Sequence, residues 1–171
     1  SISSNDVVSL YQDRSGILWI GTELGVNKFV SVTQQFRFYT PVPCTSNTLS
    51  DPYVQRIHQD DAGILWLGTD GGGLNRLDRT TGVYTHYRHD PTNPSGILDD
   101  DVNTLVPGNS GILWLGYRND GLSKFEIATE TFTHYLHDDG NPNSLNGVYV
   151  WSMLIDHEGT LWVGTDDGLN R

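Results

Sequence analysis

A seven-residue box that occurs four times constrains the fold of this chain more than any other feature. Its first copy reads Gly-Ile-Leu-Trp-Ile-Gly-Thr, and every copy carries a tryptophan followed two positions later by glycine. The four tryptophans are spaced by 47, 48 and 48 residues and are Trp19, Trp66, Trp114 and Trp162. A fixed period of this length indicates a repeat architecture, in which each repeat buries its apolar face against its neighbours.

Each box has the composition of a short β-strand, because it is rich in apolar, aromatic and β-branched residues. The glycine after each box tryptophan predicts close approach of another backbone at that point. Polar residues and glycine on both sides of the box predict tight turns, so the box is the second strand of a meander. The first repeat then has strands over Val7–Gln12, Leu18–Thr22, Val26–Val30 and Phe36–Thr40.

Four short antiparallel strands in a repeat of this length are typical of a β-propeller blade. We therefore predict an all-β fold with three four-stranded blades and a three-stranded fourth, since the fourth repeat has reached only its third strand at Arg171. The length of 171 residues suits one domain. The predicted blades cover residues 1–46, 47–94, 95–142 and 143–171.

Composition excludes several classes of partner. The net charge of −11 and the pI of about 4.6 argue against binding to nucleic acid or an anionic membrane. No apolar run is long enough to cross a membrane. The single cysteine, Cys44, cannot form an internal disulfide. We expect no cofactor.

The chain resembles the two-component regulator propeller repeat. The resemblance lies in Gly-x-Leu-Trp-x-Gly-Thr followed by Gly-Leu-Asn-Arg, best seen over Gly63–Arg76 and Gly159–Arg171, and in the lead-in Asn-Ser-Leu-Asn-Gly-Val-Tyr-Val at Asn143–Val150. It implies a piece of a propeller of about seven blades in the extracytoplasmic (periplasmic) sensor region of a bacterial two-component regulator. A histidine kinase module would lie outside this chain. The third repeat departs most, with Pro107-Gly108 after its first strand and Tyr117 replacing the box threonine.

The candidate ligand site is one face of the propeller, which we call the rim. It is formed by the turns between the second and third strands of each blade and by the loops between blades. Acidic and aromatic groups that converge there could hold a polyhydroxylated ligand, although a solvated acidic surface is the simpler interpretation. Arg56 and Trp151 also break the pattern of their aligned positions. The candidate residues are Tyr53, Arg56, Asp70, Asp101, Tyr117, Arg118, Asp120, Tyr149, Trp151, Asp166 and Asp167.

Other features have a structural interpretation that we favour over a functional one. The box tryptophans are expected in the core between blades. Asp13, Asp60, Asp61 and Asp156 precede the box glycines and are expected to cap turns rather than act in catalysis. The recurring histidines lie at the ends of fourth strands without the spacing of a metal site, so we expect no metal. They are His86, His89, His134 and His137.

The resemblance makes a non-enzymatic sensor or ligand-binding segment the leading functional hypothesis, with an oligosaccharide as a candidate ligand. Two alternatives stay open. One is a propeller enzyme, such as a lyase or glycosidase, with its site at the central axis. The other is a pure interaction scaffold. Repeats bury their core only by stacking on neighbours, so we also expect the chain to self-associate through exposed blade faces.

Overall fold

The computed structural model describes all residues, 1–171, and consists of fifteen strands in four antiparallel sheets with no helix. Each of the first three sheets is a four-stranded meander, and the fourth has three strands, as predicted. The first blade contains β1 (Val7–Gln12), β2 (Leu18–Thr22), β3 (Gly25–Val30) and β4 (Gln35–Tyr39). The second contains β5 (Val54–Gln59), β6 (Leu65–Thr69), β7 (Leu74–Asp78) and β8 (Val83–Tyr87).

The third blade contains β9 (Val102–Pro107), β10 (Ile112–Tyr117), β11 (Leu122–Glu126) and β12 (Thr131–Tyr135). The fourth contains β13 (Val150–Ile155), β14 (Leu161–Thr165) and β15 (Gly168–Asn170). The sequence places each box strand within one residue of its position in the structure. The outer strand β4 begins and ends one residue earlier than the predicted Phe36–Thr40, since its pairing with β3 sets the register.

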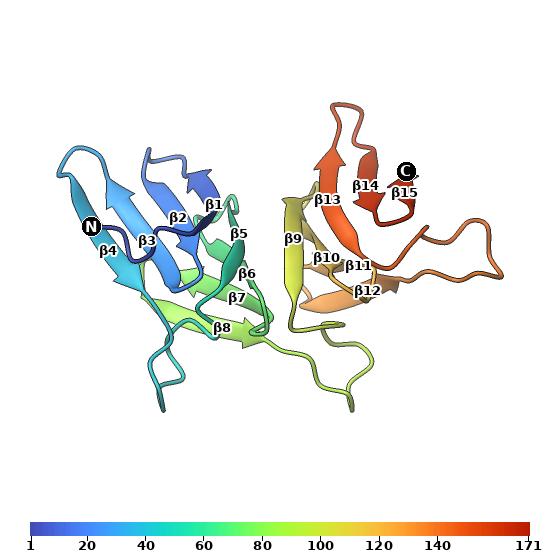
Figure 1. Cartoon of the computed structure of the whole chain (residues 1–171), viewed down its shortest axis with the longest axis horizontal. Coiled ribbons are helices and arrows are strands. Elements are labelled where there is room, and N and C mark those ends of the chain that lie inside the picture. Colours follow the sequence, from blue (N-terminus) through green and yellow to red (C-terminus); the bar gives the residue numbers. More distant parts are fainter.

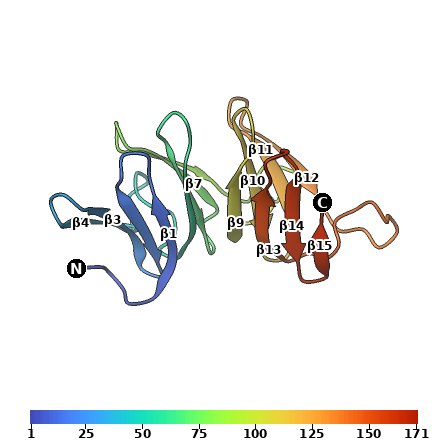
Figure 2. The same ribbon diagram turned by 90° about the horizontal axis from the view of Figure 1, so that it is seen from above.

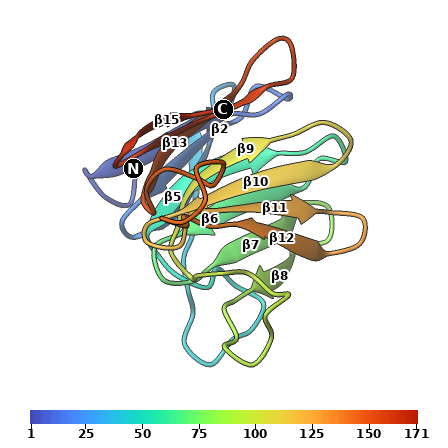
Figure 3. The ribbon, with the colours of Figure 1, turned by 90° about the vertical axis from the view of Figure 1, so that its right-hand side faces the viewer.

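The blades form an arc in which the first strands lie on the inside and the fourth strands lie outside (Figure 1). Along this inner side β1 contacts β5, β5 contacts β9, and β9 contacts β13. The two chain ends lie on opposite sides of the molecule (Figure 2). The connections formed by residues 40–53 and 88–101 project as long loops beyond β8 (Figure 3).

The core lies between the blades. One cluster joins Trp19 and Val26 of the first blade to Ile57 and Leu67 of the second. A larger cluster joins Trp66 of the second blade to the third, and a smaller one joins the third blade to the fourth. The box tryptophans of the first two blades are 1% and 0% exposed, whereas Trp114 and Trp162 are only partly buried. The prediction that the box tryptophans are buried between blades therefore holds fully for Trp19 and Trp66 only.

The glycine that follows each box tryptophan lets the next blade approach. A Cβ placed on Gly21 would stand 2.6 Å from the carbonyl oxygen of Val54, in the first strand of the second blade. One placed on Gly68 would stand 3.0 Å from the carbonyl oxygen of Val102, in the third blade. At Gly164, in the last blade, the nearest atom is the hydroxyl of Ser152 in the same blade. The close backbone approach expected from the sequence is thus an inter-blade contact.

The first and last blades each have one face with no neighbouring blade, and these two faces carry exposed apolar side chains. Val7 is 47% exposed, although Val54, at the same position of the second blade, is 0% exposed. Leu10 is 64% exposed, whereas its equivalent Ile57 is 8% exposed. On the last blade Leu169 is 66% exposed. These residues occupy positions that neighbouring blades cover elsewhere in the arc.

Candidate functional site

The rim is assembled by backbone hydrogen bonds that tie the turns after the box strands to the loops between blades. The amide of Asp70 donates to the carbonyl of Tyr53 at 3.0 Å, and the amide of Asp166 donates to that of Tyr149 at 3.1 Å. Asp70 also forms an antiparallel β-bridge to Asp101, which links the second blade to the third. The turns and loops expected on one face of the propeller are therefore in contact there.

Arg118 connects the second and third blades on the rim. Its Nε forms an ion pair with Asp101 Oδ2 at 2.7 Å. The direction of the N–H does not meet the geometry of a hydrogen bond. Its Nη2 donates to Asp70 Oδ2 at 3.4 Å. The Arg118 side chain remains 40% exposed. One cation thus lies between two carboxylates.

Two carboxyl groups of the rim have raised pKa values. Burial is the main reason that the pKa of Asp101 is about 6, and the charge of Asp70 raises it further while Arg118 opposes the shift. Burial also raises the pKa of Asp120 to about 6, together with a hydrogen bond to Asp99 and the charge of that residue. Both carboxyls therefore take up a proton more readily than ordinary aspartates.

Aromatic groups lie at the last blade of the arc. The Tyr149 and Trp151 rings are stacked, with centroids 3.9 Å apart and an interplanar angle of 23°. Trp151 is 56% exposed even though it belongs to the inner strand β13. Tyr149 also donates its amide to Asp166 Oδ1 at 3.1 Å. An exposed indole backed by a second ring is a surface on which an apolar face of a ligand can stack.

The remaining candidate residues differ in how far they are exposed. Tyr117 corrects the prediction, because it is 0% exposed and forms part of the core between the second and third blades, so it presents no rim surface. Arg56 is half-buried and donates from Nη1 to the carbonyl of Gln55 at 2.7 Å. Tyr53 is 36% exposed, and Asp167 is exposed in the β14–β15 turn.

The aspartates on the opposite face, which we call the turn face, cap their turns. Asp13 Oδ1 accepts the amides of Ser15 and Ile17, while its Oδ2 accepts Nε1 of Trp19 at 2.9 Å. Asp60 binds Trp66 and Asp156 binds Trp162 in the same way. Asp61 takes no part in this motif and pairs with Arg14 in an exposed ion pair. A recurring aspartate six residues before the box tryptophan was the sequence signal for this arrangement.

The third repeat has no such aspartate, because Gly108 takes its place. Its turn is also different, since Ser110 adopts a φ of 58° and Gly111 a φ of 76°. In the other three repeats only the glycine at the corresponding turn has a positive φ. Loss of the capping carboxylate and the altered turn thus occur together.

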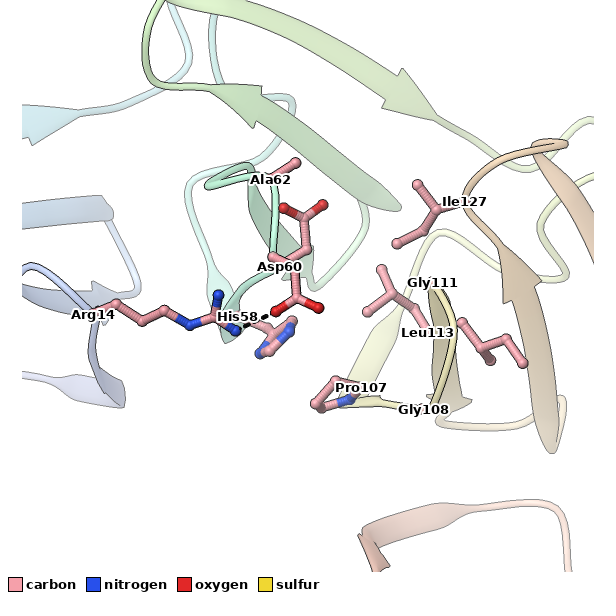
Figure 4. Close-up of a pocket in the computed structure, with 11 residues that line it drawn as sticks. Arg14, His58, Asp60, Ala62, Pro107, Gly108, Gly111, Leu113 and Ile127 are labelled. Carbon is pink, nitrogen blue, oxygen red and sulfur yellow. Dashed lines mark hydrogen bonds and ion pairs between the residues drawn. The ribbon is translucent and has the colours of Figure 1, made fainter. Parts of the chain in front are cut away.

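A pocket that sequence reasoning missed lies on the turn face between the second and third blades (Figure 4). Its volume is about 450 Å³. Asp60 and His58 line one side of it, and Pro107, Gly108 and Ile127 line the other (Figure 4). Burial lowers the pKa of His58 below its usual value, which favours the neutral imidazole. The pocket is therefore remote from the predicted rim and on the face that we expected to be structural.

Two of the recurring histidines, His89 and His137, hold the loops that follow them. Nδ1 of His89 lies 3.1 Å from the carbonyl oxygen of Ile97, and Nδ1 of His137 lies 2.7 Å from that of Leu145. The two contacts are equivalent in successive repeats. No group of three or more histidine, cysteine, aspartate or glutamate side chains is arranged to hold a metal ion. No helix capable of spanning a bilayer is present.

Fold and surface together define a class of protein: a β-propeller arc whose blades are joined by an inter-blade core and whose rim carries ionic and aromatic groups. The family model described as "two component regulator propeller" matches residues 1–24, 48–71 and 144–167. The chain is thus similar to this repeat family over three of its four repeats, in line with the resemblance found in its sequence. The third repeat, in which Gly108 and Tyr117 replace the motif residues, lies outside the matched segments.

Solved structures share the propeller fold. The chain is similar, at 25% identity and a TM-score of 0.86, to the extracellular domain of BT3049 from B. thetaiotaomicron, described as a hybrid two-component system. It also resembles the extracellular domain of BT4673 from the same organism, at 23% identity and a TM-score of 0.79. These alignments cover 99% and 98% of this chain but only 25% and 21% of the others.

The chain therefore spans about a quarter of the first of those domains. The BT3049 domain is extracellular, in agreement with the extracytoplasmic location predicted from the family resemblance. A computationally designed protein, Ika4, shares the fold at 15% identity and a TM-score of 0.66, with 93% of its chain covered. No curated protein sequence matches the chain.

Proposed function

We propose that this chain is a non-enzymatic, ligand-binding part of the extracytoplasmic sensor region of a bacterial two-component regulator. The observation that carries the proposal is the stacked, exposed Tyr149–Trp151 pair on the inner strand of the last blade. Sugars present an apolar face that stacks on such rings and hydroxyls that bind carboxylates and guanidinium groups. Arg118, Asp70 and Asp101 on the neighbouring rim supply those polar groups. The ligand class that fits best is an oligosaccharide.

The proposal is tested by screening neutral and acidic oligosaccharides while the tryptophan fluorescence of the chain is recorded. Trp151→Ala should abolish binding measured by calorimetry, a readout that does not depend on the indole removed. Arg118→Gln should weaken binding about tenfold, the loss expected for one charge-assisted hydrogen bond. Phe38→Ala is the matched control, because Phe38 is 47% exposed but belongs to the outer strand β4. Binding that survives Trp151→Ala, or that is lost equally in Phe38→Ala, would contradict the assignment of the rim.

We further propose that the isolated chain self-associates head to tail. The exposed Val7 and Leu10 of the first blade correspond to residues that the preceding blade buries elsewhere in the arc. The exposed Leu169 corresponds to Leu74 and Leu122, which the following blade buries. The last blade of a second copy therefore offers the surface that the first blade lacks.

Light scattering across a dilution series measures this association. The solution mass should exceed that of one chain and fall on dilution, and Leu10→Glu should shift the chain to monomer. Val32→Glu is the matched control, since Val32 is 93% exposed in the β3–β4 turn, away from the interface. A wild-type chain that stays monomeric at every concentration would refute the proposal.

A further inference from the structure

Between the first two blades, a carboxylate on the turn face binds a cation from the neighbouring blade. Arg79, in the turn between β7 and β8, reaches across the blade interface and pairs through Nη1 with Oδ2 of Asp13. Its Nε donates to the carbonyl of Gly63 at 3.2 Å, and its guanidinium carbon lies 5.7 Å from the centroid of the Trp19 ring. The carboxylate that accepts the indole N–H of the first blade thus also binds a guanidinium.

The interface between the second and third blades has the equivalent carboxylate, Asp60, but no arginine that pairs with it. Asp60 accepts the amide of Ile64 on Oδ1 and the indole N–H of Trp66 on Oδ2, as Asp13 does with its equivalents. The residue at the position of Arg79 in the third blade is Ile127, which cannot pair with a carboxylate. Asp60 forms no salt bridge, so the acceptor capacity that Arg79 uses at Asp13 is unused here.

Space for a ligand exists at that acceptor. Asp60 and Ile127 line the pocket of about 450 Å³ (Figure 4). Gly108, which takes the place of a capping aspartate in the third repeat, also lines it. The other carboxylate of the pocket, Asp61, already pairs with Arg14. The unpaired charge in the pocket is therefore that of Asp60, and the net charge of −11 attracts cations to the whole molecule.

We propose that this pocket binds a guanidinium group on the Asp60 carboxylate, in the way that Asp13 binds Arg79. The ligand class is an arginine side chain, either of a peptide or of the free amino acid. A guanidinium donates to a carboxylate and a nearby carbonyl at once, as Arg79 does with Asp13 and Gly63, whereas an ammonium group supplies only a point charge. The site is independent of the rim, and its failure would leave the proposed oligosaccharide site untouched.

The indole N–H resonances of the five tryptophans report on the site directly in a ¹⁵N-correlated NMR spectrum. N-acetyl-arginine amide should shift the Trp66 signal saturably, because that indole shares the Asp60 carboxylate. The signal of Trp162, which shares Asp156, should move little, because this carboxylate lies outside the pocket. The uncharged isostere N-acetyl-citrulline amide should give no shift at Trp66. An arginine-containing peptide distinguishes a peptide ligand from the free amino acid by tighter binding.

Matched variants complete the test. Asp60→Asn should weaken binding of the arginine derivative about tenfold or more, while Asp156→Asn makes the same change outside the pocket and should not. Ile127→Arg should place a guanidinium group of the chain itself in the pocket. The Trp66 indole signal should then be shifted without ligand and should no longer respond to ligand. Val32→Arg adds the same charge at the equivalent position of the first blade and should leave binding unchanged. Equal response to citrulline and arginine derivatives, or unchanged binding in Asp60→Asn, would overturn the proposal.

Discussion

Ser50 and Asn75 form a reciprocal pair that fastens the second blade to the loop preceding it. The Ser50 amide donates to Asn75 Oδ1 at 2.9 Å, and Asn75 Nδ2 donates to Ser50 Oγ at 2.7 Å. Ser3 and Asn27 form the same pair in the first blade. In the third blade Leu98 and Ser123 occupy these positions, and Tyr117 replaces the box threonine. The serine, the asparagine and the box threonine are thus all exchanged in the third blade, and Tyr117 joins the core.

Asn75→Ala should destabilise the chain by about 2 kcal/mol, because Asn75 is 0% exposed and its loss leaves the Ser50 amide without an acceptor. Ser50 Oγ would keep only its bond to the Gly72 carbonyl. Urea denaturation followed by fluorescence measures the free energy of unfolding. Asn170→Ala removes the corresponding residue of the more exposed last blade, where water can replace it. The effect there should be smaller, and equal losses would contradict this account.

Asp13 should make the free energy of unfolding depend on pH in the acid range. Burial alone would raise its pKa, but hydrogen bonds from Ser15, Trp19, Ile17 and Arg79 outweigh burial and lower the pKa to about 2. A depressed pKa stabilises the fold above the unfolded value near 4, and this contribution, about 2 kcal/mol, is lost as the pH falls from about 4 to about 2. Urea midpoints measured over that range should fall less steeply in Asp13→Asn than in the wild type.

Asp101 should have the opposite pH dependence. Its folded pKa of about 6 exceeds the unfolded value, so the folded state holds the proton more tightly. The free energy of unfolding should therefore decrease as the pH rises from about 4 to about 6. Asp101→Asn should stabilise the chain at pH 7 by no more than about 1 kcal/mol, since the rim is partly solvated. The variant should have no such advantage at pH 4, and thermal melts at both pH values test this.

Gly21→Ala should disrupt the contact between the first and second blades. The new Cβ would stand 2.6 Å from the Val54 carbonyl oxygen, so the backbones must separate. The expected loss is about 1–3 kcal/mol, the usual range for overpacking. Gly164→Ala is the control, since only the movable Ser152 hydroxyl lies close to it. A smaller loss in Gly21→Ala than in Gly164→Ala would show that the blades do not pack as described.

Much of the fold is local in origin, and the sequence therefore predicts it. The box, its two turns and the period of about 48 residues specify antiparallel meanders, because each strand pairs with its neighbour in the chain. The aspartates of the turn face are also local, since each caps a turn within its own hairpin. Their role follows from residue type and position alone.

The sites depend on contacts between blades, which residue spacing does not contain. Sequence placed Tyr117 on the rim, but packing against the second blade buries it, because the third blade lacks the threonine and asparagine that fill this space elsewhere.

Likewise, nothing in the linear pattern shows that Arg79 reaches Asp13 across an interface while Ile127 leaves Asp60 unpaired. The sequence by itself determined the strands, their order and the resemblance to the repeat family. Only the tertiary structure decided which charges meet and where the pocket lies, because those relations depend on how one blade stacks on the next.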